Sequence, residues 1–161
     1  MHLFVINLPE HVERWRATEA AFAKVGWCAE RFEARRGAAM PPDTLARHYS
    51  AKANEKSFYR PLTLAEIGCY ASHLAVWQHM VDQGWPLLAV FEDDVCPDDG
   101  LPNVLRALQR GPRNWDMVKL IGRELERPYR PAPLTERHQL IGYRRVPSLT
   151  GGYVISRDGA H

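Results

Sequence analysis

The sequence has few of the features that mark secreted, membrane-spanning or nucleic-acid-binding chains. It contains three cysteines in 161 residues, an odd number without a pairing pattern, which favours reduced thiols over a disulfide framework. Its longest apolar runs, such as residues 86–91, are far shorter than the ~20 residues of a membrane helix. Lys and Arg number 21 against 19 Asp and Glu, and this formal charge of +2 gives no argument for nucleic acid as a partner.

The first residues also lack the pattern of a secretory signal. Residues 1–6 have no basic start, no extended apolar stretch and no small-residue cleavage site, and they resemble a first strand instead. We therefore expect a cytoplasmic protein. With 45% hydrophobic and 25% charged residues, the composition is that of an ordinary globular chain, and we expect a single domain over residues 1–161.

Helical and strand patterns alternate along the chain, which predicts an α/β sandwich with a mostly parallel sheet and flanking helices. The expected strands are 3–6, 28–34, 87–91, 117–121, 139–143 and 153–156. The expected helices are 12–22, 63–81 and 101–108, and a further helix is expected to start after the last strand. Residues 38–61 show no sustained period, and we interpret them as a long loop with at most one short helix.

The clearest helix start is a capping box at Thr63 and Glu66, in which the Thr63 hydroxyl accepts from the Glu66 amide and Glu66 reaches back. Residues at spacings of three and four then predict the buried face of this helix. These are Leu64, Ile67, Tyr70, Ala71, Leu74, Trp77 and Val81. Gly84 is the expected stop.

Three consecutive carboxylates, Glu92, Asp93 and Asp94, follow the apolar strand 87–91. Burying unpaired anions is costly, so a positive group is expected beside them. In a strand Glu92 and Asp94 would point to one side and Asp93 to the other. Oxygen ligands at the carboxyl end of a strand suit Mg²⁺ or Mn²⁺. The alternative is a solvated acidic turn, with Asp98 or Asp99 capping the next helix.

Several motifs of the sequence resemble glycosyltransferase family 25, the family of lipooligosaccharide and collagen galactosyltransferases. The resemblance covers nearly the whole chain in the family's motif order, and its most specific parts are the EIGC…SH helix and the EDD strand end. The motifs are VINL at 5–8 with Arg14, LTLAEIGCYASH at 62–73, FEDDV at 91–95, WDMVKL at 115–120 and YVIS at 153–156 with Gly159 and Ala160.

This resemblance implies a GT-A-like nucleotide-binding fold that transfers a sugar, often galactose, from a UDP-sugar to a glycan or glycolipid acceptor in lipopolysaccharide assembly. Glu92, Asp93 and Asp94 stand where such enzymes hold Mn²⁺ or Mg²⁺ on the diphosphate, and Asp94 is the first expected ligand. A metal there would stabilise the leaving UDP. The enzyme is expected at the inner face of the membrane as a peripheral protein.

Six further residues fall in motifs that resemble donor-binding positions. They are Asn7, Arg14, Ser72, His73, Lys119 and Thr150. Some of them have a structural alternative: Arg14 could pair with Glu10 on a solvated helix face, and His73 could be hydrogen-bonded in the interior.

Other interpretations remain open at this point. Cys69 and His73 lie one helical turn apart and could form half of a zinc site, although the sequence offers no second pair at ligand spacing. A metal-dependent phosphohydrolase or a non-catalytic nucleotide-sugar or glycan-binding module could also use the acidic strand end. The general base is not indicated, and the family's distal acidic motif is expected beyond residue 161.

Overall fold

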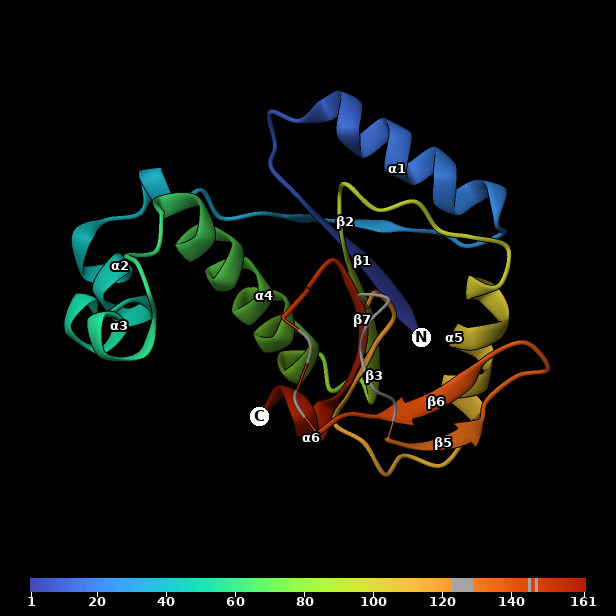
Figure 1. The fold of residues 1–161 in the computed structure, drawn as a ribbon. Helices are drawn as coiled ribbons and strands as arrows, with labels where there is room; N and C mark the ends of the chain where they lie inside the picture. The colour runs from blue at the N-terminus through green and yellow to red at the C-terminus, as the bar shows by residue number, and fades with distance from the viewer. Residues whose placement is uncertain (123–128, 145, 147) are drawn as a thin grey trace.

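The computed structural model describes residues 1–122, 129–144, 146 and 148–161. Its main sheet has five strands in the order β2-β1-β3-β7-β4 (Figure 1). Their bounds are β1 His2–Asn7, β2 Glu30–Glu33, β3 Leu87–Glu92, β4 Met117–Lys119 and β7 Gly152–Ser156. The strand β1 pairs in parallel with β2 and β3, and β7 runs antiparallel to β3 and β4. The predicted α/β fold with a mostly parallel sheet is confirmed.

Helices cover both faces of this sheet, and the period of two along the strands assigns each strand residue to one face. Leu87, Ala89 and Phe91 pack with Phe22 of α1 (Val12–Lys24) and with apolar residues of α5 (Leu101–Arg110). The alternate residues Leu88 and Val90 pack against α4 (Leu64–Asp82). Unbroken apolar strands are therefore explained by burial on both sides.

The helix α4 begins with the predicted capping box, since the Glu66 amide donates to the Thr63 hydroxyl and the Thr63 amide donates to Glu66. Its predicted buried face was wrong in part: Ile67 and Ala71 are buried, but Leu64 is 46% and Tyr70 50% exposed. The buried residues of α4 form a set that overlaps the predicted one only in part. They are Ile67, Gly68, Ala71, Ser72, His73, Val76 and Met80.

Residues 38–61 are more helical than predicted. They contain part of a 3-10 helix, η1 (Gly37–Ala39), and two short helices, α2 (Pro42–His48) and α3 (Ala51–Ser57). Figure 1 shows α2 and α3 beside the start of α4, away from the sheet. Neither helix has a fully buried residue, so no apolar period reveals them in the sequence.

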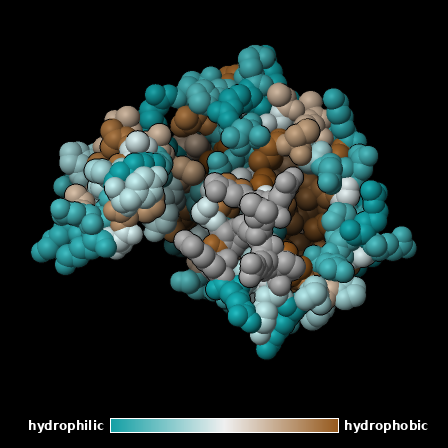
Figure 2. All heavy atoms as spheres, in the orientation of Figure 1, coloured by the Kyte–Doolittle hydropathy of each residue, from teal (hydrophilic) through white to brown (hydrophobic). Residues whose placement is uncertain are grey.

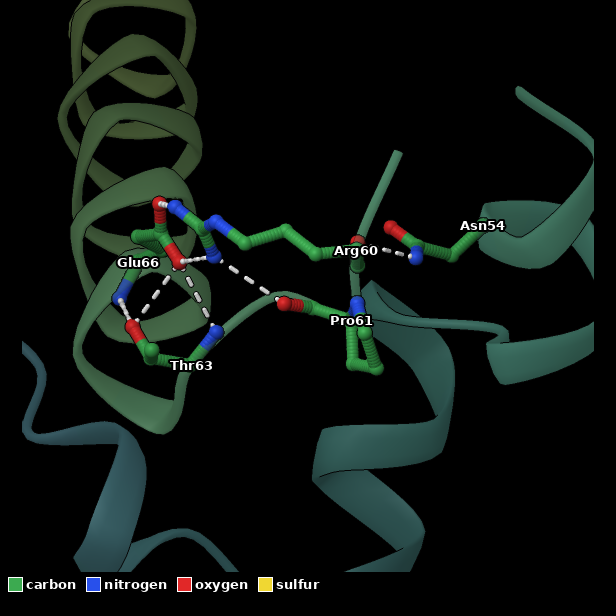
Figure 3. A network of polar contacts seen from close by, with 5 residues as sticks. All are labelled: Asn54, Arg60, Pro61, Thr63 and Glu66. Carbon is green, nitrogen blue, oxygen red and sulfur yellow. Dashed lines mark hydrogen bonds and ion pairs between the residues drawn. The ribbon is translucent and has the colours of Figure 1, made fainter. Parts of the chain in front are cut away.

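Arg60 connects this region to the first turn of α4 (Figure 3). Its guanidinium donates to both Glu66 carboxylate oxygens at 2.6 and 2.8 Å, and its carbonyl accepts from Asn54. The Arg60 guanidinium and the hydrogen bonds from Thr63 lower the pKa of Glu66 to about 2. The capping role predicted for Glu66 is confirmed.

A close backbone crossing joins η1 to α4. A Cβ atom at Gly68 would lie 2.6 Å from the Arg35 carbonyl oxygen and 2.6 Å from the Gly37 amide nitrogen. Since both neighbours are backbone atoms, neither can rotate away. The glycine of the EIGC motif is thus required by packing.

The remaining elements lie after β4. Strands β5 (Tyr129–Pro133) and β6 (Gln139–Gly142) form a separate antiparallel pair, of which only β6 was predicted. The short helix α6 (Arg157–Ala160) follows β7, as expected. Among the helices of the described residues, none has the length and hydropathy needed to span a bilayer.

Candidate functional site

Asp93 lies at the carboxyl end of β3 and is held by side chains from β1 and α1. Its Oδ1 forms an ion pair with Arg14 Nη2 at 2.9 Å, and its Oδ2 accepts a hydrogen bond from Asn7 Nδ2 at 2.6 Å. Its backbone carbonyl accepts from the Thr18 hydroxyl. The positive partner expected for the buried acid is therefore Arg14, and the alternative pairing of Arg14 with Glu10 was wrong. Glu10 pairs with Arg36 instead.

Asn7 is the centre of this network and is 1% exposed. Its Oδ1 accepts from Arg31 Nε and Nη2, and its Nδ2 also donates to the His11 carbonyl. Arg31 lies on β2, directly beside β1 in the sheet. The sequence prediction included Asn7 and Arg14 and missed Arg31 and Thr18, since only strand pairing brings Arg31 to this end.

Asp94 differs from Asp93 in being exposed. Its side chain is 62% exposed against 11% for Asp93, and its Oδ2 lies 3.7 Å from Arg14 Nη2. The predicted alternation separates Glu92 from Asp93, but it does not extend to Asp94. The strand ends at Glu92, and residues 93–94 form a turn in which both aspartates approach the same guanidinium.

Glu92 lies on the opposite face of the sheet, toward α4. Its Oε1 accepts a hydrogen bond from the Thr150 hydroxyl at 2.6 Å and lies 3.5 Å from His73 Nε2. The His73 imidazole and the Thr150 hydroxyl hold the pKa of Glu92 below its usual value, although burial opposes them. Thr150 and His73, both predicted as site residues, therefore meet one member of the acidic triplet.

His73 is buried and held from its other side. Its Nδ1 lies 2.7 Å from the Tyr153 hydroxyl, which also accepts a hydrogen bond from Trp77 Nε1 at 2.7 Å. Burial raises the pKa of Tyr153, so its hydroxyl is a neutral hydrogen-bonding group. The interior position proposed for His73 is confirmed. The sequence prediction missed Tyr153, whose hydroxyl in an apolar strand is the available signal.

Two predicted residues lie apart from the acidic end. The Ser72 hydroxyl donates to the Gly68 carbonyl and accepts from the Arg35 amide, so it joins α4 to the segment after β2. Lys119 Nζ donates to the Leu149 carbonyl. These three contacts are with backbone groups, and none of them is with Glu92, Asp93 or Asp94.

A cavity of about 680 Å³ lies between β4, α5 and the β5–β6 pair. Its lining is largely apolar, with Val95, Trp115 and Leu140 among the residues, and Lys119 contributes a polar group. Figure 2 shows apolar atoms gathered on this face beside α5. Val95 and Cys96 line the cavity and directly follow the acidic turn at residues 93–94.

Comparison with known proteins identifies the family of this chain. A family description, "Glycosyltransferase family 25 (LPS biosynthesis protein)", matches residues 1–161. The chain belongs to glycosyltransferase family 25. The resemblance inferred from the sequence motifs is thereby confirmed, and the α/β architecture agrees with a GT-A-like fold.

Individual relatives of this family 25 chain are longer than the chain itself. It is 35% identical to Procollagen galactosyltransferase 1 of Danio rerio over 105 residues, 63% of this chain and 17% of the relative. It is 32% identical to Lacto-N-neotetraose biosynthesis glycosyltransferase LgtB of Neisseria gonorrhoeae over 165 residues, 98% of this chain and 57% of the relative. A Glycosyltransferase 25 family member of Drosophila melanogaster is 28% identical over 98% of this chain and 26% of its own length.

Proposed function

We propose that this chain is the donor-binding part of a metal-dependent glycosyltransferase. It would transfer a sugar, galactose in the first instance, from a UDP-sugar to a glycan or glycolipid acceptor of lipopolysaccharide type. Family membership and the names of the galactosyltransferase relatives support the reaction class. The cytoplasm, with peripheral contact at the inner membrane face, remains the proposed location.

The observation that carries the proposal is the different state of the two aspartates at the end of β3. Asp93 is fixed by Asn7 and Arg14, with both carboxylate oxygens engaged, whereas Asp94 projects into solvent from the same turn. A rigid acid beside an exposed one is the arrangement expected where a ligand meets the edge of an open α/β sheet.

The donor atoms fit a hard divalent cation. Mg²⁺ and Mn²⁺ are bound through one or two carboxylates, with phosphate oxygens and water completing the shell. Asp94 would supply the first carboxylate, while Asp93 positions the turn and Glu92 lies at its start. When bound, the cation would neutralise charge on the departing diphosphate.

Arg14 provides a second group, besides the cation, that can bind an anionic diphosphate. Its guanidinium is about half exposed, and it already bridges Asp93 and Asp94. A diphosphate approaching Asp94 through a cation would come within reach of the same guanidinium, which can donate to phosphate oxygens in a planar fork. Asn7 and Arg31 hold the base of this arrangement in place.

Calorimetric titration with UDP, with and without Mn²⁺, tests the proposal. We expect Mn²⁺-dependent UDP binding that is lost in Asp94→Ala. Asp99→Ala is the matched control, since it removes another exposed carboxylate five residues downstream. Absence of UDP binding, or equal loss in both variants, would contradict the donor site.

A donor and acceptor screen then separates the reaction classes. Sugar transfer from a UDP-sugar supports the transferase. Phosphate release from simple esters without transfer would indicate a phosphohydrolase. UDP binding without any turnover would indicate a binding module.

A further inference from the structure

Three side chains of unlike chemistry meet between the middle of α4 and the end of β3. Cys69 and His73 are one turn apart on α4, and Glu92 is the last residue of β3. Each offers one donor atom, a sulfur, a ring nitrogen and a carboxylate oxygen, and these atoms all lie within 4.8 Å of one another. Sulfur, nitrogen and oxygen together form the ligand types that bind zinc.

His73 supplies an independent observation, a buried ring nitrogen without a hydrogen bond. The residue is 5% exposed, and its Nε2 atom has no hydrogen-bond partner among the described residues. The nearest acceptor, Glu92 Oε1, lies 3.5 Å away, beyond a good hydrogen bond. Buried polar atoms are rarely left unsatisfied, because each costs about 1–3 kcal/mol.

The other ring nitrogen of His73 is held by an oxygen atom. Metal-ligating histidines donate their second ring N–H to an oxygen, which fixes the tautomer and the ring orientation. His73 Nδ1 lies 2.7 Å from the Tyr153 hydroxyl oxygen, and that hydroxyl is itself held by Trp77. Cation binding requires the tautomer with the proton on Nδ1, in which the Nε2 lone pair is directed toward Cys69 and Glu92.

We propose that Cys69, His73 and Glu92 bind zinc, or another divalent cation that prefers thiolate and imidazole ligands. Two ligand atoms of a tetrahedral zinc are about 3.5 Å apart, given bonds of about 2.0–2.3 Å. The His73 and Glu92 pair already has this separation. Three protein ligands leave the fourth position for water, as in open zinc sites.

The thiol must lose its proton on binding. Desolvation, together with the charges of Glu92 and Asp94, raises the pKa of Cys69 to about 11, so the free protein carries a thiol at neutral pH. The cation forms its bond to sulfur as the S–H bond breaks, and the proton passes to solvent. The same anionic neighbours that disfavour a thiolate alone favour a cation beside it.

This inference does not depend on the proposed glycosyl transfer. The cation proposed for Asp94 is hard and binds oxygen, whereas this one is selected by sulfur and nitrogen. Glu92 borders both sites. The experiment therefore reads the thiolate bond itself and uses neither nucleotide nor sugar.

The test is a titration with Co²⁺, which takes the place of zinc and gives a near-ultraviolet thiolate-to-metal absorption. The chain is kept in a phosphine reductant, and the wild type is compared with Cys69→Ser and with the double variant C28S/C96S. The double variant keeps Cys69 as its only thiol, because the chain has three cysteines in all. Circular dichroism checks that each variant is folded.

We expect one equivalent of Co²⁺ to produce the thiolate absorption in the wild type and in C28S/C96S, with Zn²⁺ displacing it. Cys69→Ser should lose the absorption while remaining folded, and His73→Asn should weaken Co²⁺ binding at least tenfold, roughly the scale of losing a ligand's support. No thiolate absorption in the wild type, or its survival in Cys69→Ser, would overturn the site. A chain that binds UDP with Mn²⁺ yet gives no absorption overturns this inference alone.

Discussion

The Tyr153 hydroxyl joins His73 and Trp77 across the interface between β7 and α4, at 2.7 Å from each. Removing it in Tyr153→Phe takes the hydrogen-bond partner from the buried His73 Nδ1 and from the partly buried Trp77 Nε1. We expect a loss of about 1–3 kcal/mol in the free energy of unfolding, measured by urea denaturation. Tyr70→Phe, on α4, is the control. Tyr70 is half exposed, and its change should stay within about 0.5 kcal/mol.

Asn7→Ala should destabilise the acidic strand end. Asn7 is buried and bonds Asp93, Arg31 and the His11 carbonyl, so the alanine variant removes several partners at once. We expect a loss of about 1–3 kcal/mol in the free energy of unfolding by chemical denaturation. Arg16→Ala breaks an exposed ion pair with Glu13 and should change stability by less than about 1 kcal/mol. Equal effects would contradict the network.

Glu66→Gln should change the acid dependence of stability. The folded-state pKa of Glu66, about 2, lies below the ordinary value of 4.5, so its carboxylate contributes stability above pH 4.5. That contribution is lost as the pH falls toward 2. The melting temperature of the variant should therefore lie below that of the wild type near neutral pH, and the difference should shrink in acid. A difference that grows in acid would contradict the Arg60 and Glu66 pairing.

Gly68→Ala should cost more than an alanine at a glycine with open surroundings. The new Cβ would meet two backbone atoms at 2.6 Å, and we expect about 1–3 kcal/mol from overpacking, with η1 displaced from α4. Gly26→Ala is the comparison, because Gly26 has φ of 75° and no atom within 4 Å of a Cβ. Its cost comes from backbone strain alone, about 1–2 kcal/mol. Thermal unfolding of both variants gives the ranking.

The strands and the start of α4 were predictable because their signals are local. An apolar run such as residues 87–91 indicates a strand that is buried on both faces of the sheet. The capping box at Thr63 and Glu66 depends on only four consecutive residues. The buried face of α4 was not predictable in this way. Apolar residues surround the helix, and its buried side includes Ser72 and His73, whose partners Arg35 and Tyr153 lie 37 and 80 residues away.

The candidate site was partly predictable for the same reason. Motif positions indicated Asn7, Arg14 and Asp93 as separate polar residues at element ends, and the structure brings them into direct contact. Arg31 could not be inferred, because its role depends on β2 lying beside β1. The order of strands depends on the packing of the whole sheet, so the spacing of residues along the sequence does not predict it.

Glu92 and Asp93 are neighbours along the chain, yet one contacts α4 and the other α1. The single peptide bond between them therefore connects the helical layers on opposite sides of the sheet. A displacement of the backbone at residues 92–93 would therefore disturb the contacts of both α1 and α4. Substitutions that loosen this linkage should raise amide hydrogen exchange in both α1 and α4, while α5, which has no contact with either carboxylate in the described ion pairs, keeps its protection.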